Sequence, residues 1–131
     1  MKEIFKISKD KERAKDLFKM AKDRLEIIKI LPRDKPYKFI EEYYEIIKEL
    51  LTAVMYSDGY KTLSHVKLLD YFVENYEIDD SYAKLIDNLR KFRNDIVYYG
   101  KKITEDFLVN NENDIKKIID MLIKFVEKKL K

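Results

Sequence analysis

The chain has 131 residues, of which 28 are Lys or Arg and 25 are Asp or Glu, so its net charge is only +3. This length suits one domain over residues 1–131, and the charge is far from that of a dedicated duplex-binding protein. The lack of cysteine excludes disulfides and thiolate metal sites, and a single histidine excludes two-histidine sites, so we expect no metal and no cofactor. Any chemistry must therefore use Arg, Lys, Asp, Glu, Tyr, Asn or His65.

Targeting signals are missing from the sequence. No apolar run approaches the roughly 18 to 20 residues that a membrane-spanning helix needs, and the N-terminus lacks the apolar stretch of a signal peptide. We therefore expect no membrane partner and a cytoplasmic location. Abundant Lys, Glu and Ile, the absence of glutamine and the scarcity of glycine predict a thermophilic source.

Helix-breaking residues divide the chain into segments of bundle length, and there are four of them: Pro32, Pro36, Gly59 and Gly100. The first helix is expected after Ser8 as N-cap, because apolar residues recur at helical spacing over residues 14–31. A second helix is expected to start at the second proline and to stop at the first glycine. Its wet side is expected to consist of four glutamates: Glu41, Glu42, Glu45 and Glu49.

Two further helices are expected between the glycines. The third and shorter one covers residues 62–76, with Thr62 or Ser64 at its start. The fourth takes Asp79 or Asp80 as its N-cap and ends at the second glycine, which offers a left-handed stop.

A last helix is expected to start at Thr104 and to cover residues 105–130, although the polar stretch 110–114 can interrupt it with a fresh N-cap. The sequence contains no internal repeat, linker or strand signal. The connecting turns are short, so neighbouring helices should be antiparallel. The predicted fold class is therefore all-α, an up-and-down antiparallel helical bundle of four to five helices.

Arg93 interrupts the apolar face of the fourth helix. At about 100° per residue it lies about 40° from the centre of the stripe marked by Leu89, so it belongs to the inward face. A guanidinium is costly to bury unless it is paired, so an inward arginine indicates a buried partner, a subunit interface or an anionic ligand pocket. The simplest of these is an intramolecular pair with an acidic residue of a facing helix.

The sequence RNDIVYYG, at residues 93–100, resembles the signature of the HEPN superfamily. That signature is an Arg, usually followed by a polar residue, with a His after four to six intervening positions near the end of the penultimate helix. Arg93 and Asn94 match it. The stretch GYKTLSHVKLLDYF, at residues 59–72, resembles the usual entry into the family's third helix. The resemblance extends from Tyr37 onward and implies a bundle of four to five helices.

In this sequence Tyr98 occupies the position of the family's histidine. In members that cleave RNA without metal, the Arg steadies the scissile phosphate, and the His activates the ribose 2′-hydroxyl or protonates the leaving group. Tyrosine does this poorly, because an ordinary pKa near 10 leaves about one part in a thousand ionised at pH 7. The resemblance implies that RNA or a nucleotide binds at Arg93, Asn94 and Tyr99, and that Arg93 and Tyr98 form the catalytic pair of a weak ribonuclease.

A homodimer is expected, because HEPN proteins commonly dimerise with the motif at the interface. Tyr98 lies about 180° and Tyr99 about 80° from the stripe centre, so Arg93 and Tyr98 do not share a face of one continuous helix. Either the helix unwinds before Gly100, or Tyr98 reaches the arginine of a second subunit.

The resemblance also implies a toxin–antitoxin setting, in which a minimal nucleotidyltransferase acts as antitoxin and modifies a motif tyrosine, here Tyr99. The alternative is a non-catalytic interaction or substrate-binding subunit that partners such a nucleotidyltransferase and buries Arg93 for structural reasons. A third interpretation is a helical adaptor with no role in nucleic-acid binding.

Other residues have two interpretations each. His65 is either a remote replacement for the missing base or, as we favour, a residue that satisfies a backbone group or packs against an aromatic ring. Four tyrosines are either stacking platforms for bases or half-buried residues of the bundle: Tyr43, Tyr44, Tyr98 and Tyr99. The lysines of the first helix alternate with acidic residues, which favours a solvated surface over a phosphate-binding one.

Overall fold

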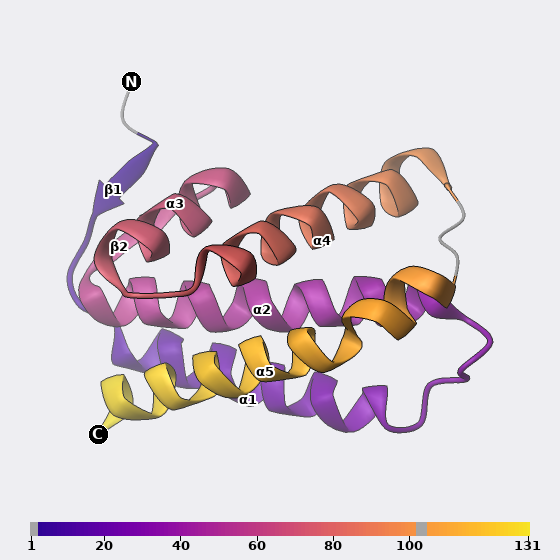
Figure 1. Ribbon diagram of the computed structural model, residues 1–131. Helices are drawn as coiled ribbons and strands as arrows, with labels where there is room; N and C mark the ends of the chain where they lie inside the picture. The colour runs from indigo at the N-terminus through magenta and orange to yellow at the C-terminus, as the bar shows by residue number, and fades with distance from the viewer. Residues whose placement is uncertain (1–2, 102–104) are drawn as a thin grey trace.

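The computed structural model describes residues 3–101 and 105–131. Within these ranges five helices and two short strands follow one another (Figure 1): β1 (Ile4–Lys6), α1 (Lys11–Ile28), α2 (Pro36–Asp58), β2 (Tyr60–Thr62), α3 (His65–Asn75), α4 (Asp80–Tyr99) and α5 (Glu105–Leu130). The prediction of an all-α helical bundle is therefore confirmed. Helix α1 ends at Ile28, three residues before the end of the predicted apolar stripe.

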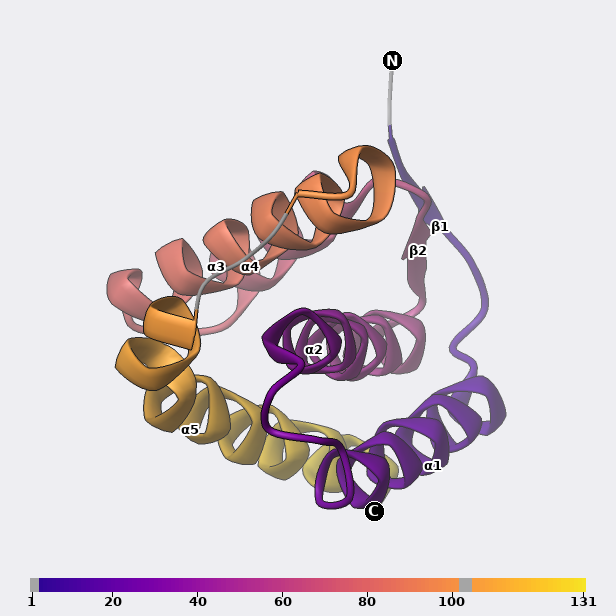
Figure 2. The same cartoon turned by 90° about the vertical axis from the view of Figure 1, so that its right-hand side faces the viewer.

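Helix α2 lies at the centre of the bundle. Figure 2 shows α1, α5 and the α3–α4 pair arranged around it, and α2 contacts each of these helices. Residues on every side of α2 are buried, including Ile40, Ile46, Leu50 and Val54. The prediction that four glutamates form a solvent-exposed side of this helix is wrong, because none of the four is fully exposed and Glu49 is only 6% exposed. A surrounded helix must bury polar residues that a peripheral amphipathic helix would turn to water.

Side-chain caps explain where the helices begin. Asp10 and not Ser8 caps α1, since its Oδ1 accepts a hydrogen bond of 2.9 Å from the backbone N–H of Arg13. Ser64 and Asp79 cap α3 and α4 as predicted, each accepting from a backbone N–H of the first turn. Such caps satisfy amide groups that have no partner inside the helix.

The helix ends follow the two glycines. Gly59 has φ of 89° and Gly100 has φ of 63°, so both end a helix as predicted, each in the left-handed conformation that was expected for Gly100. Helix α5 covers Glu105–Leu130 as predicted, without the interruption considered at residues 110–114. There the Asn111 side chain donates to the backbone carbonyl of Phe107 at 2.9 Å, one turn earlier in the same helix. The predicted start at Thr104 lies outside the described residues.

A small antiparallel sheet was not expected from the sequence. Strands β1 and β2 pair with Ile4 opposite Thr62, and the amide of Ile7 donates to the carbonyl of Gly59 at 2.9 Å. Three residues per strand are too few to show the alternation of apolar and polar residues that reveals a strand. The pairing fixes the segment that leads into α3.

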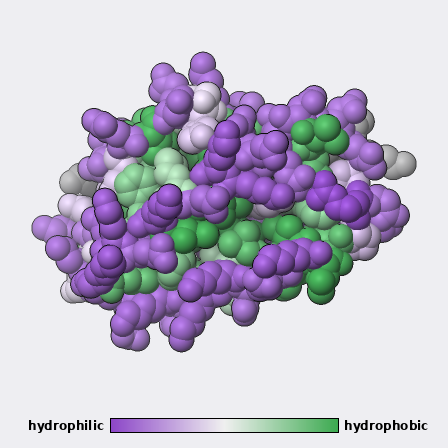
Figure 3. All heavy atoms as spheres, turned by 60° about the horizontal axis from the view of Figure 1, so that its bottom comes forward, coloured by the Kyte–Doolittle hydropathy of each residue, from purple (hydrophilic) through white to green (hydrophobic). Residues whose placement is uncertain are grey.

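The surface formed by α1 and α5 is mostly charged. Figure 3 shows this face, with hydrophilic side chains over most of it and apolar atoms in a band between them. On α1, Lys15 and Glu12 form an exposed ion pair of 3.7 Å, as expected for a solvated surface. None of the helices in the described ranges combines the length and apolar character needed to cross a membrane.

Candidate functional site

Arg93 extends from α4 toward the central helix. Its side chain is 17% exposed, and its Nη2 lies 3.2 Å from Oε1 of Glu45 on α2. The predicted inward orientation of Arg93 is therefore confirmed, and Glu45 is the acidic partner on a facing helix. The second terminal nitrogen, Nη1, lies 3.4 Å from Oδ1 of Asn94, which is long for a hydrogen bond.

Glu45 divides its carboxylate between two cations. Its second oxygen, Oε2, accepts from Nζ of Lys48 at 2.7 Å. Burial raises the pKa of Glu45, but the hydrogen bond from Lys48 and the charges of Lys48 and Arg93 outweigh it, so the pKa is lowered. Glu45 is therefore ionised at neutral pH, and one negative charge faces two positive charges.

Tyr44 connects Arg93 to His65. The guanidinium carbon of Arg93 lies 5.9 Å from the centroid of the Tyr44 ring, and Tyr44 Oη is 3.0 Å from Nδ1 of His65. The tyrosine and histidine rings also contact each other, with centroids 5.7 Å apart. Burial raises the pKa of Tyr44 to about 12 although Arg90 and Arg93 oppose the shift, so this hydroxyl stays protonated.

The environment of His65 is positively charged. Burial lowers the pKa of this imidazole, and the charges of Lys48, Arg93 and Arg90 lower it further. His65 packs against an aromatic ring, as favoured from the sequence, and that ring belongs to the site of Arg93. We call the following residues the Arg93 cluster: Tyr44, Glu45, Lys48, His65, Arg90 and Arg93.

Tyr98 lies near Arg93 without any break in the helix. Helix α4 continues to Tyr99, yet the guanidinium carbon of Arg93 is 6.0 Å from the centroid of the Tyr98 ring, at the outer limit of a cation–π contact. The expectation that the helix must unwind or a second subunit must intervene is wrong, because the wheel angle ignores the length of the arginine side chain. Tyr98 is 67% exposed, and Tyr99 is 75% exposed on another side of the helix.

Tyr43 and Tyr44 of α2 are too buried to be stacking platforms. Tyr43 and Tyr44 are 1% and 3% exposed, so neither ring has a free face for a base. The Tyr43 hydroxyl donates to Glu112 of α5 at 2.6 Å. Among the four tyrosines considered from the sequence, Tyr98 and Tyr99 alone offer exposed rings.

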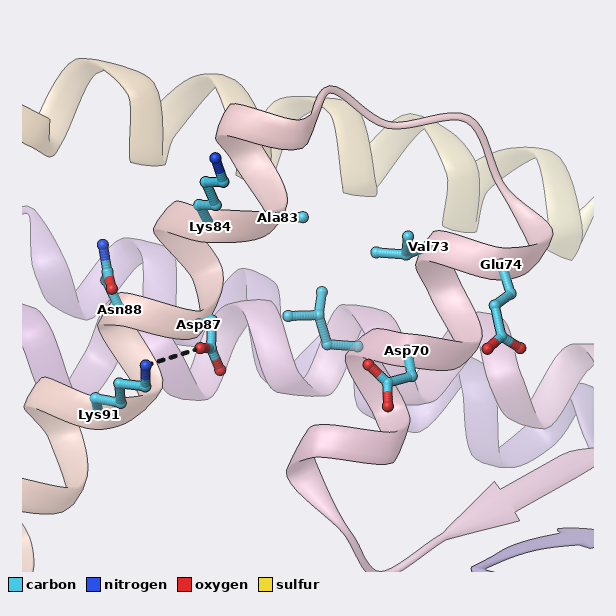
Figure 4. Close-up of a pocket in the computed structure, with 9 residues that line it drawn as sticks. Asp70, Val73, Glu74, Ala83, Lys84, Asp87, Asn88 and Lys91 are labelled. Atoms are coloured by element: carbon cyan, nitrogen blue, oxygen red, sulfur yellow. Dashed lines mark ion pairs between the residues drawn. The ribbon is translucent and has the colours of Figure 1, made fainter.

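A groove of about 460 Å³ separates α3 from α4 next to the Arg93 cluster. Figure 4 shows Asp70 and Glu74 on the α3 side and Lys84 and Lys91 on the α4 side. Asp87 lies at its edge, accepting from Arg90 at 3.0 Å and pairing with Lys91 at 3.3 Å. Acidic and basic side chains line this groove together, so it does not favour an anion as the Arg93 cluster does.

The fold and the site define an all-α bundle with a partly buried arginine–glutamate pair beside a tyrosine–histidine pair. Comparisons with protein-family models, with curated proteins and with solved structures found no match to this chain. No group of three or more His, Asp or Glu side chains placed to hold a metal ion occurs in residues 3–101 and 105–131.

Proposed function

We propose that this chain is a HEPN-like protein that binds RNA through a backbone phosphate at the Arg93 cluster and cleaves it slowly without a metal ion. The shared carboxylate of Glu45 is the observation that supports this proposal, since its one negative charge serves both Lys48 and Arg93. A structural ion pair needs no second cation. An anion site does, because the added phosphate must find positive charge that is not already neutralised.

The hydrogen-bonding capacity of Arg93 also supports phosphate binding. A guanidinium has five N–H donors, and here one terminal nitrogen contacts Glu45 while the other makes only a long contact to Asn94. Arg93 keeps 17% of its side chain exposed. A phosphate oxygen can therefore approach without breaking the pair that holds the arginine in place.

The exposed end of α4 fits a role in holding RNA or a partner. Tyr98 lies beside Arg93 with its ring 67% exposed, as stacking on an unpaired base requires. We further propose that the protein acts as a homodimer with this end at the interface. In a toxin–antitoxin setting, Tyr99, which is 75% exposed in the single chain, is the tyrosine that a minimal nucleotidyltransferase would modify.

A non-catalytic interaction subunit is the second candidate function. Val97, Tyr98 and Tyr99 are 47%, 67% and 75% exposed in consecutive positions at the end of α4. Apolar and aromatic side chains exposed together are typical of surfaces that bind another protein. In this role, Glu45 and Arg93 would serve only to join α2 to α4.

Binding of a fluorescent single-stranded RNA at several salt concentrations tests the proposal. We expect Arg93→Ala to weaken binding about tenfold and to reduce the slope of log affinity against log salt by about 0.7, the value for one phosphate contact on a single strand. Arg33→Ala is the matched control, because Arg33 pairs with Glu112 of α5 at 2.9 Å, a contact that involves no member of the Arg93 cluster. It should leave the slope unchanged.

Cleavage of the same RNA at saturating protein completes this test. Arg93→Ala should abolish cleavage, and Tyr98→His should increase it by restoring the family's histidine. Equal RNA binding by folded wild type and Arg93→Ala would reject the proposal. In that case, binding of a nucleotidyltransferase, lost when Tyr98 and Tyr99 are changed to Ala, would support the interaction subunit instead.

A further inference from the structure

His65 is the only histidine of the chain, and the fold places it at the start of α3 beside the arginines of α4. Ser64 caps α3, and strand β2 is paired with β1 just before it. The backbone of His65 is therefore held on both sides. An imidazole with a fixed position can transfer a proton in a defined direction.

The two ring nitrogens of His65 have different environments. Nδ1 contacts Tyr44 Oη at 3.0 Å, whereas Nε2 makes no hydrogen bond to any other residue of the described chain. The imidazole is half-buried. Tyr44 also contacts the guanidinium of Arg93, so its ring joins the imidazole to the arginine that would hold a phosphodiester.

We propose that His65 is the general base of this site: Nε2 accepts the proton of the ribose 2′-hydroxyl while Arg93 holds the scissile phosphate. The inference rests on the proposed ribonuclease function. It assigns to a residue of α3 the proton transfer that Tyr98 performs poorly from the end of α4. Tyr44 is a positioning residue that acts through His65.

The proton balance of the step is complete without a further reagent. The 2′-hydroxyl loses its proton to Nε2 as the 2′ oxygen forms a bond to phosphorus. The bond from phosphorus to the 5′ oxygen breaks, and that oxygen takes a proton from water. The products are a 2′,3′-cyclic phosphate and a free 5′-hydroxyl, and His65 then returns its proton to water.

The tautomer that this step requires is compatible with Tyr44. A neutral imidazole carries one proton, and when Nδ1–H donates to Tyr44 Oη, the lone pair of Nε2 is available. The charged groups facing His65 are Glu45 and Lys48 from α2 and Arg90 and Arg93 from α4. Burial and the charges of Lys48, Arg93 and Arg90 lower the pKa of His65 although Glu45 opposes the shift, so the neutral form that can accept a proton dominates at neutral pH.

Two substitutions separate a catalytic role from a structural one. His65→Asn keeps a polar group near Nδ1 that can bond to Tyr44, and His65→Gln keeps one near Nε2, but neither side chain titrates. We expect both to slow single-turnover RNA cleavage by about 100-fold or more, the usual contribution of a general base. Binding of an RNA with a 2′-deoxy nucleotide at the scissile position, which cannot be cleaved, should change less than about twofold.

The pH profile is the readout that a purely structural histidine would not change. The wild-type rate should rise with pH to a plateau, with the midpoint of the rise below pH 6.5, because the pKa of His65 is lowered from that value. The residual activity of both variants should not show this rise with pH. Cleavage by His65→Asn at the wild-type rate would overturn the inference and leave the proposed function intact. Unchanged RNA binding by Arg93→Ala would instead reject the proposed function. Wild-type protein that binds RNA but never cleaves it would overturn both the role of His65 and the proposed cleavage, and would leave RNA binding at Arg93.

Discussion

Two arginines meet the glutamates of the central helix, one from each side, and their charges are neutralised to different extents. Arg24 of α1 bonds to Glu49 through Nε and to Glu42 through Nη1, at 3.1 Å to the nearer oxygen of Glu42. One guanidinium there faces two carboxylates. Arg93 of α4 has only Glu45, which also serves Lys48.

The difference separates a structural ion pair from a candidate binding site. At Arg24 both Nε and Nη1 donate to carboxylates of α2, and Glu49 is almost fully buried. Around Arg93 there are three cations, two carboxylates and a neutral imidazole. This count includes Arg90 and its partner Asp87. Burial alone would not distinguish them, since the side chains of Arg24 and Arg93 are 28% and 17% exposed. The ratio of carboxylates to cations distinguishes the two arginines.

The largest expected effect is on stability. Arg24→Ala should lower the free energy of unfolding by about 3 kcal/mol, because it leaves the buried carboxylate of Glu49 without its partner. Arg93→Ala should cost about 1 kcal/mol, because Glu45 keeps Lys48. Urea unfolding of both variants at pH 7 measures the difference. Equal losses would mean that Arg93 is as structural as Arg24, and the comparison would fail.

The next effect is on affinity. Glu45→Gln should tighten the binding of single-stranded RNA about three- to tenfold, or about 1 kcal/mol, because Arg93 and Lys48 lose the carboxylate that competes with phosphate. Glu49→Gln removes the same charge one turn further along α2, where Arg24 is its partner, and should change affinity less than twofold. Fluorescence anisotropy at constant salt, on variants shown to be folded, measures both. Equal tightening by the two variants would point to a general effect of net charge.

Local sequence signals predicted the helices well. Ser64, Asp79, Gly59 and Gly100 act at the ends of helices as expected, because a cap depends on a few neighbouring residues. The short strands were missed, since a pairing of three residues leaves no pattern. Of the two alternatives for the last helix, the structure has the uninterrupted one.

The site was only partly predictable. The inward face of Arg93 follows from helical periodicity, which is a property of α4 alone. Its partner Glu45 and the contact between Tyr44 and His65 depend on which helix occupies the centre of the bundle, and no periodicity reveals that. A polar stripe on an otherwise very apolar helix is the signal that could have identified α2 as the central helix. Its glutamates at positions 42, 45 and 49 follow the helical spacing of one face.

The smallest expected effect concerns pH and tests whether Glu45 is held by its cations. Because the folded-state pKa of Glu45 is lowered, its ionised form stabilises the fold above the ordinary value of 4.5, and this contribution is lost as the pH falls through the lowered pKa. Wild type should therefore be more stable than Glu45→Gln at pH 7, and the gap should close below pH 4.5. Glu26→Gln, which removes an exposed carboxylate paired with Lys29, is the control without such a gap. Urea unfolding across this range measures both, and a gap that persists at low pH would mean that the shape of Glu45 matters more than its charge.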